Sequence, residues 1–142
     1  MPYITTYKNK IILRLLYHFR LIGLGFKLSA VRWHSNHNTR KNPTTKEILK
    51  LFYFDFLGVP EEDCDIIKIT DKEFITRCKN KCPILELSLY LGIDTKKSCK
   101  QISEGLCKFF LEEINKNITF KRNYDHIRPY KEDCEEIITI KG

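Results

Sequence analysis

Residues 83–115 read PILELSLYLGIDTKKSCKQISEGLCKFFLEEIN, and this stretch decides the fold that the sequence predicts. Pro83 suits the first position of a helix, because its missing N–H would have no partner there anyway. Gly92 then ends that helix, and Asp94 or Thr95 caps a second, longer one. Apolar residues recur at helical spacing along both segments. The sequence therefore predicts two packed helices in this region.

Short segments rich in β-branched residues flank the helix pair. Residues 66–69 and 73–78 are joined by a turn around Asp71, which predicts a hairpin. Residues 118–120 and 137–140 predict two further strands after the helices. We therefore expect an α+β fold in which helices pack on an antiparallel sheet.

The N-terminal third differs in charge from the rest of the chain. Residues 1–46 contain nine Lys or Arg and no Asp or Glu, whereas the remainder has 16 basic and 18 acidic residues. Residues 7–28 have apolar positions at helical spacing, which predicts a basic amphipathic helix ending near Gly23 or Gly25. A polar linker over 35–43 would follow this helix.

This pattern divides the chain into two parts. Residues 1–43 are expected to form a basic amphipathic arm with its linker, and residues 44–142 a cysteine-bearing α+β domain. The second part would begin with a helix capped by Thr44 or Thr45 and ended by Gly58. The arm has three interpretations: residues 8–41 bind nucleic acid, they bind an anionic membrane surface, or the apolar face packs on the domain.

The cysteine content indicates a reducing compartment. Six cysteines in 142 residues are too few for a small secreted disulfide scaffold. Charged residues interrupt the N-terminal apolar run, and no cleavage site or stretch of 18 apolar residues is present. A cytoplasmic location is therefore expected, where clustered cysteines indicate metal binding or catalysis more often than disulfides.

The strongest candidate site is a set of cysteines in the C-terminal half. Cys78, Cys82, Cys99 and Cys134 could act as thiolate ligands for zinc or an iron–sulfur cluster, because thiolates are soft ligands and four of them close a tetrahedral site. Some cysteines could instead be small buried residues of the core. We prefer that interpretation for Cys107, on the packed helix face, and for Cys64, in an acidic turn.

A single cysteine could alternatively be a nucleophile. Cys82 precedes Pro83 at a helix start, and Cys99 is expected in the first turn of the next helix, where the helix dipole lowers a thiol pKa. Either thiolate could then attack a substrate while His126 shuttles protons. The chain would in this case be an enzyme with a single cysteine nucleophile.

A loop before the last strand contains a second group of polar residues. Tyr124, His126, Arg128 and Tyr130 could bind a small anionic ligand, with Arg128 as the clamp and His126 as an acid or base. The alternative is an ordered surface loop whose tyrosines pack on the sheet and whose arginine pairs with a neighbouring glutamate. Both alternatives stay open at this point.

The C-terminal half resembles a known group of proteins. A strand leading to Cys78, the Cys82-Pro83 helix start, the helix SCKQISEGLCKFFLEEIN and the closing segment NITFKRNYDHIRPYKEDCEEIITI carry this resemblance. They are similar to 4-vinyl reductase-type small-molecule-binding domains and to L-2-amino-thiazoline-4-carboxylic acid hydrolase-like proteins. The glycine that these families usually have shortly before the last cysteine is absent here. The resemblance implies an α+β fold with a ligand pocket between helices and sheet. Some members of these families are hydrolases or reductases, so the resemblance also implies that an enzyme with a cysteine nucleophile would be hydrolase-like.

Overall fold

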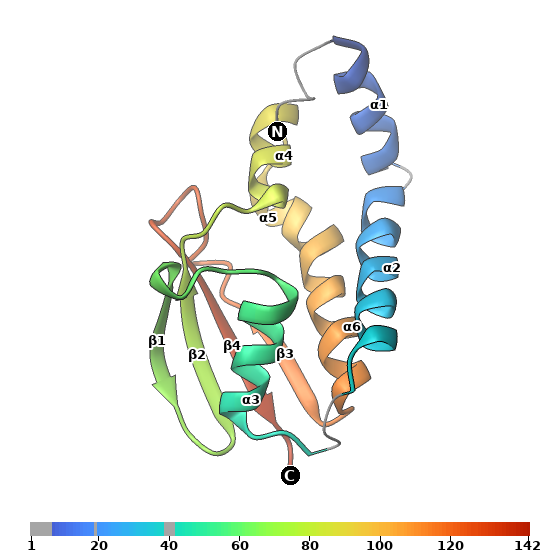
Figure 1. Ribbon diagram of the computed structural model, residues 1–142. Coiled ribbons are helices and arrows are strands. Elements are labelled where there is room, and N and C mark those ends of the chain that lie inside the picture. Colours follow the sequence, from blue (N-terminus) through green and yellow to red (C-terminus); the bar gives the residue numbers. More distant parts are fainter. Residues whose placement is uncertain (1–6, 19, 39–41) are drawn as a thin grey trace.

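The computed structural model describes residues 7–18, 20–38 and 42–142, and its helices and strands form the predicted α+β fold (Figure 1). The helices are α1 (Tyr7–His18), α2 (Leu21–Asn36), α3 (Thr45–Leu49), α4 (Pro83–Leu91), α5 (Thr95–Ser98) and α6 (Glu104–Ile114). The strands are β1 (Cys64–Ile69), β2 (Glu73–Cys78), β3 (Ile118–Arg122) and β4 (Cys134–Ile140). Among the described residues, no helix has the length and apolarity needed to cross a bilayer.

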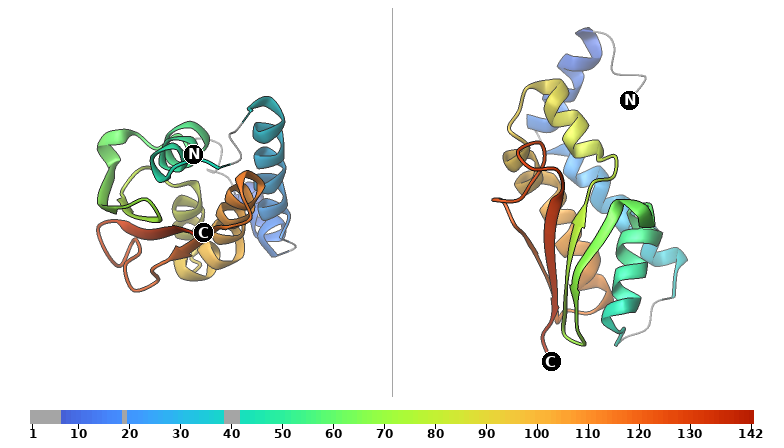
Figure 2. Two further views of the ribbon diagram at one scale, coloured as in Figure 1. Left: turned by 90° about the horizontal axis from the view of Figure 1, so that it is seen from below. Right: turned by 90° about the vertical axis from the view of Figure 1, so that its left-hand side faces the viewer.

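The four strands form one antiparallel sheet in the order β1-β2-β4-β3. Side chains alternate along each strand, so every second residue faces the helices. In β2 the buried positions are Phe74, Thr76 and Cys78, whereas the residues between them are half-buried. The helix-facing side of the sheet is thus the one that forms the core, and Figure 2 shows the helices gathered over it.

Local sequence signals set the helix ends. The Thr44 hydroxyl accepts a hydrogen bond from the Glu47 amide, and the Glu47 carboxylate accepts one from the Thr44 amide, which completes a capping box. Pro83 occupies the first turn of α4 as predicted, and Gly92 ends it with a left-handed φ of 67°. Asp94 caps α5 by accepting a hydrogen bond from the Lys96 amide.

Two π-helical segments interrupt the longer helices. Lys50–Phe56 continues α3, and Cys99–Ser103 links α5 to α6, so the predicted second helix is continuous but locally widened. A π-helical turn contains an extra residue and therefore shifts which side chains face the core. This shift cannot be predicted from helical spacing alone.

The arm differs from the single helix that the sequence predicts. Its helix does not end near Gly23 or Gly25, because α2 runs through both glycines. The break comes earlier, at Arg20, which has a left-handed φ of 60°. The expected linker over 35–43 starts late, since α2 extends to Asn36. Within this linker, residues 39–41 lie outside the described residues.

The arm packs on the rest of the chain. Ala30 of α2 is fully buried, and the ring of Trp33 lies 5.1 Å from that of Phe110 in α6. The His34 Nε2 also donates a hydrogen bond to the Phe110 carbonyl at 3.0 Å. The helices α1 and α2 therefore add an outer helical layer, in which α2 packs beside α6, and the separate unit predicted for residues 1–43 stays a prediction.

The core consists of two clusters of buried side chains. The larger cluster lies between the sheet, the helical segment 45–56 and α6, and it includes Phe52, Phe74 and Phe110. The smaller cluster lies at the α4 end of the molecule and includes Tyr17 and Ile127. Both clusters thus receive side chains from the arm as well as from the body.

Candidate functional site

A cavity of about 260 Å³ lies where the two core clusters meet. Its wall takes Tyr53 and Leu106 from the larger cluster and Ile84 and Cys99 from the smaller one. Exposed lining residues mark where the cavity reaches the surface, between α2, the segment after α3 and the start of α4; these are Ser29, Leu57, Lys81 and Pro83. The volume is just below the roughly 300–1,000 Å³ typical of ligand pockets, so it suits a compact molecule.

Two adjacent rows of the sheet contribute side chains to one wall of the cavity, namely Cys78 and Cys134 from one row and Arg122 and Glu136 from the other. In the first row, Cys78 of β2 lies between its cross-strand partners Cys64 and Cys134. In the second row, Glu136 of β4 lies between its partners Thr76 and Arg122. Because these rows are two residues apart along each strand, all their side chains point to the helix-covered face.

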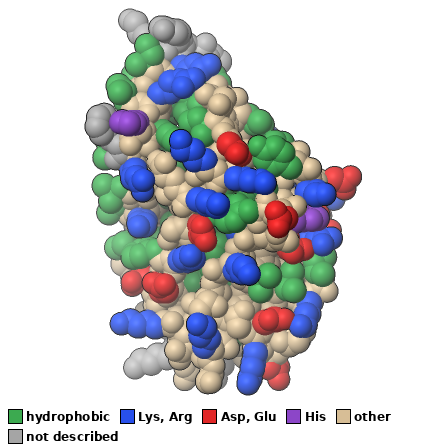
Figure 3. Space-filling model, turned by 180° about the vertical axis from the view of Figure 1, so that it is seen from behind, with side chains coloured by type: hydrophobic (Ala, Val, Ile, Leu, Met, Phe, Trp, Pro, Cys, Tyr) green, Lys and Arg blue, Asp and Glu red, His purple; other side chains and the backbone are tan. Residues whose placement is uncertain are grey.

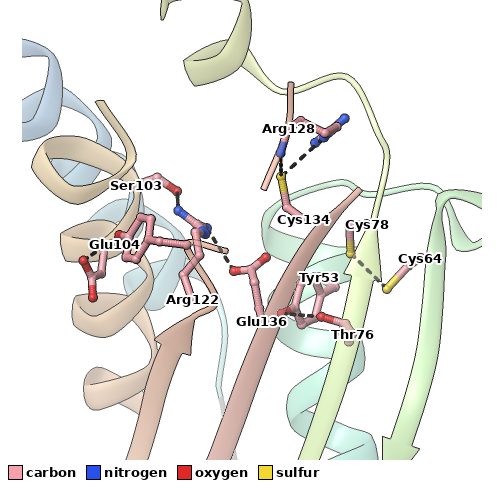
Figure 4. A network of polar contacts seen from close by, with 11 residues as sticks. Tyr53, Cys64, Thr76, Cys78, Ser103, Glu104, Arg122, Arg128, Cys134 and Glu136 are labelled. Atoms are coloured by element: carbon pink, nitrogen blue, oxygen red, sulfur yellow. Dashed lines mark hydrogen bonds and ion pairs between the residues drawn. The ribbon is translucent and has the colours of Figure 1, made fainter. Parts of the chain in front are cut away.

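A buried ion pair spans the second row. Arg122 Nη2 lies 2.9 Å from Glu136 Oε2, and both side chains are only 7% exposed. Arg122 Nη1 also donates a hydrogen bond to the Ser103 hydroxyl at 3.0 Å. Figure 4 shows the arginine and the glutamate pointing toward one another from β3 and β4.

One donor of this arginine is left over. Arg122 Nε is buried and has no acceptor among the described residues. Although burial opposes the charge, the Glu136 carboxylate raises the pKa of Arg122 above its usual value, so the guanidinium stays protonated. A buried charged donor without a partner is unfavourable, and an acceptor brought by a ligand would satisfy it.

All four cysteines predicted as metal ligands line this cavity. Cys78, Cys82, Cys99 and Cys134 are joined there by Cys107, and every cysteine of the chain is a free thiol. The last strand pairs with the strand that ends at Cys78, and this register places Cys134 opposite Cys78. Among the residues described, however, no group of three or more Cys, His, Asp or Glu is arranged to hold a metal ion.

The pKa expected for Cys99 is wrong. This thiol follows α5, five residues after the cap Asp94, so it lies beyond the first turn in which the helix dipole acts. Burial raises the pKa of Cys99 to about 11, and it raises that of Cys107 to about 12, although the Arg122 guanidinium opposes both shifts. Cys82, in contrast, does sit at the start of α4, half-buried beside Pro83.

Cys64, which the sequence places in an acidic turn, lies in contact with a second cysteine. Its Sγ accepts a hydrogen bond from Cys78 Sγ at 3.2 Å, and both thiols are buried. This hydrogen bond lowers the pKa of Cys64 and, together with burial, raises that of Cys78. Cys64 is therefore the more acidic member of the pair.

The predicted loop site does not form as one group. The His126 imidazole pairs with Asp133, the Tyr124 hydroxyl donates to Glu104 in α6, and the Tyr130 hydroxyl donates to Asp94. Of the four loop residues, Arg128 alone lines the cavity. Its Nε approaches Cys134 Sγ at 3.4 Å, and its Nη1 donates to the Asn80 carbonyl. Neither neighbouring glutamate pairs with Arg128, because Glu135 pairs with Arg77 and Glu136 pairs with Arg122.

The polar centre of the cavity, Arg122 with Glu136, was not predicted from the sequence. Arg122 comes two residues after the predicted strand 118–120, and Glu136 comes directly before the predicted strand 137–140. Continuing the alternation of each strand puts both residues on the helix-covered face. A charged residue of each sign at an inward position was therefore a readable signal. Tyr53 was a weaker one; its hydroxyl accepts a hydrogen bond from Thr76 at 2.9 Å, and burial raises its pKa.

No family model, curated protein or solved structure matches this chain. The similarity to 4-vinyl reductase-type domains and to the hydrolase-like proteins rests on the sequence pattern, and it stays a prediction. The chemistry of the cavity must then be argued from its own side chains.

Proposed function

We propose that this chain is a small-ligand-binding domain whose cavity takes a compact, mainly apolar molecule with an anionic or oxygen acceptor group. The observation that carries this proposal concerns Arg122, a residue that lines the cavity: its buried Nε has no acceptor among the described residues. Ligand pockets combine apolar walls with a few polar groups that fix orientation, and this cavity has that composition.

The charges of the cavity favour an anion over a cation. Lys81, Arg122 and Arg128 line it, whereas Glu136 is its one carboxylate among the described lining residues and already pairs with Arg122. A carboxylate oxygen would complete the hydrogen bonds of the guanidinium, because an arginine presents its donors in a planar fork that matches this group. The ligand class is therefore a small carboxylic acid with an apolar body.

The test compares acids with their uncharged analogues. Phenylacetate and 2-phenylethanol have the same carbon skeleton, and other small carboxylic acids are likewise paired with the alcohol of the same skeleton. Binding is measured by ligand-observed NMR and by the shift in the melting temperature of the protein. We expect the acids to bind more tightly than the alcohols. A panel in which no acid binds, or in which acids and alcohols bind equally, contradicts the proposal.

The chain offers a matched pair of variants for the cavity mouth. Ser29 and Ser35 are both exposed serines of α2, and each donates a hydrogen bond to a carbonyl three residues earlier, but Ser29 alone of the two lines the cavity. Ser29→Trp should obstruct the mouth and weaken acid binding by about tenfold or more, while Ser35→Trp should leave it unchanged. If the two variants weakened acid binding equally, the acid would not bind in the cavity, and the proposal would be contradicted.

Metal binding is the second candidate, because five of the six cysteines line one cavity. Zinc or an iron–sulfur cluster would be held by Cys78, Cys82, Cys99 and Cys134, as the sequence predicts. The test is the metal content of protein purified without oxygen from a cytoplasmic expression host, the compartment we propose. Near-stoichiometric metal that is lost in Cys82→Ser and in Cys134→Ser supports this function, and metal-free wild type contradicts it.

A hydrolase-like enzyme with a cysteine nucleophile has less support. The raised pKa of Cys99 leaves little thiolate at neutral pH, which reduces its reactivity. His126, the proposed proton shuttle, does not line the cavity. Cys82, half-buried at the start of α4, is then the remaining candidate for the nucleophile.

A further inference from the structure

The outer helices carry a series of exposed large apolar side chains. Those of α2 are Leu21, Leu24, Leu28 and Val31, each between 49% and 60% exposed. Those of α1 are Ile11, Ile12 and Leu15, between 43% and 53% exposed. We call the four residues of α2 the apolar stripe. Figure 3 shows hydrophobic and basic side chains interleaved along the edge that α1 and α2 form.

The apolar stripe is a single face of α2. Its members are spaced by three, four and three residues, and at about 100° per residue this spacing keeps them within one side of the helix. The fully buried Ala30 lies on the opposite side, where α2 packs on α6. The stripe thus points away from the core, and its leucines do not contribute to either core cluster.

Basic side chains flank the apolar stripe on both sides. On a helical wheel at about 100° per residue, Arg32 falls beside Leu28 on one edge, while Lys27 falls on the other edge. Arg20 immediately precedes α2, at the same end as Leu21. All three are exposed. Residues 1–46 contain no acidic residue, so this surface has no negative charge from its own segment.

This combination matches one kind of partner. Helices with exposed Leu, Ile or Val between Lys and Arg lie in the interface of anionic bilayers, where the apolar side chains enter the acyl boundary and the cations contact the headgroups. Surfaces that bind single-stranded nucleic acid combine basic side chains with aromatic rings on which bases stack. Here the Trp33 ring is already stacked on His37 at 3.9 Å and packed beside Phe110, so this ring is occupied by contacts within the chain. A second copy would bring another set of cations against the first.

We propose that the apolar stripe and its flanking cations Arg20, Lys27 and Arg32 dock on the surface of an anionic lipid bilayer. The leucines insert at the level of the headgroups, and α2 lies in the plane of the membrane while its opposite side stays packed on α6. Docking does not depend on the cavity or on what the cavity binds.

The experiment is cosedimentation of the full chain with vesicles. One set of vesicles is phosphatidylcholine with one third phosphatidylserine, and the other is phosphatidylcholine alone. We expect binding to the anionic set, weaker binding in high salt because screening reduces the attraction of the cations, and little binding to the neutral set. No sedimentation with anionic vesicles overturns the proposal.

Matched variants separate the stripe from net charge. Leu24→Glu/Leu28→Glu should reduce binding by about tenfold or more, because it removes two apolar insertions. Leu89→Glu/Ile67→Glu changes the charge equally at exposed apolar positions elsewhere, 61% and 50% exposed, and should retain most of the binding. Equal losses in the two variants overturn the proposal, since binding would then depend on net charge alone.

Two further outcomes would assign the surface to another partner. A wild-type dimer in analytical ultracentrifugation that Leu24→Glu/Leu28→Glu dissociates, without vesicle binding, would show that a second copy covers the stripe. Duplex DNA binding that Lys27→Gln/Arg32→Gln weakens and the leucine variants leave intact, again without vesicle binding, would show a nucleic-acid surface. Either result overturns the proposal.

Discussion

Replacing Arg122 tests the polar centre of the cavity most directly. Arg122→Met removes one member of a buried pair and leaves the Glu136 carboxylate, 7% exposed, without its ion-pair partner. Breaking such a pair costs about 3–5 kcal/mol, because an uncompensated charge stays in the interior. At about 2–4 °C per kcal/mol for a chain of this size, the melting temperature should fall by about 6–20 °C.

The double variant is the sharper measurement. Arg122→Met/Glu136→Leu removes both charges, so it should recover most of the lost stability, because replacing a buried ion pair by apolar side chains is often neutral or stabilising. The surface pair of the same sheet is the control. Arg77 is 37% exposed and lies 2.8 Å from Glu135, and Arg77→Met should cost only about 0–1 kcal/mol.

Urea unfolding measures these differences. Trp33 is the sole tryptophan, and its ring packs against Phe110, so its fluorescence reports on the contact between α2 and α6. Circular dichroism at the same urea concentrations reports on the whole fold, and coincident transitions justify two-state free energies of unfolding. The reasoning is refuted if Arg122→Met is no more destabilising than Arg77→Met, or if the double variant is as unstable as the single one.

Three further predictions concern thiols, acid stability and a helix end. In iodoacetamide alkylation at pH 7.5, the half-buried Cys82 and Cys134 should react well before Cys99, because a pKa of about 11 reduces the thiolate of Cys99 about 100-fold relative to an ordinary thiol. Mass spectrometry of the alkylated peptides checks the order, and equal rates would contradict it. The Asn123 amide, and then the Arg77 guanidinium, lower the pKa of the Glu135 carboxyl, so the unfolded chain takes up this proton at a higher pH than the folded one. The stability from Glu135 is therefore present above the unfolded pKa of about 4.3, and it is lost as the pH falls through the folded pKa. In Glu135→Gln, the free energy of unfolding should fall less steeply as the pH is lowered through this range. An unchanged slope would exclude this role of Glu135. Thr44→Ala removes the N-cap of α3 and should cost about 0.5–2 kcal/mol in urea unfolding, whereas an effect near zero would show that the capping box contributes nothing.

Local features of the fold could be predicted because each depends on neighbours in sequence. The capping box at Thr44, the Pro83 start and the Gly92 end all act within one turn of helix. The strand 73–78 was predicted with its observed limits, since the β-branched and aromatic pattern is strong there. The left-handed break at Arg20 was not predicted, because arginine has no preference for that conformation.

The site depends on pairings that spacing does not encode. The four cysteines were expected to lie close together, and they do line one cavity, but the register of β2 against β4 that brings Cys134 opposite Cys78 is a long-range feature. The π-helical turn at Cys99 similarly places a thiol in the interior that a regular helix would have put elsewhere. His126 was predicted for the site because of its chemistry, yet Asp133 in the same loop pairs with it outside the cavity.

The position of the cavity between the two core clusters has a consequence for cooperativity. Each cluster holds its own end of the molecule, and side chains such as Ile84 and Leu106 approach the junction from different clusters. Proteins open in contiguous units whose free energies differ, and a molecule that touches two units raises the opening free energy of both. A ligand in this cavity would contact both clusters and would therefore couple their local unfolding. Amide hydrogen exchange in α4 and in β2 would then slow together when the ligand binds.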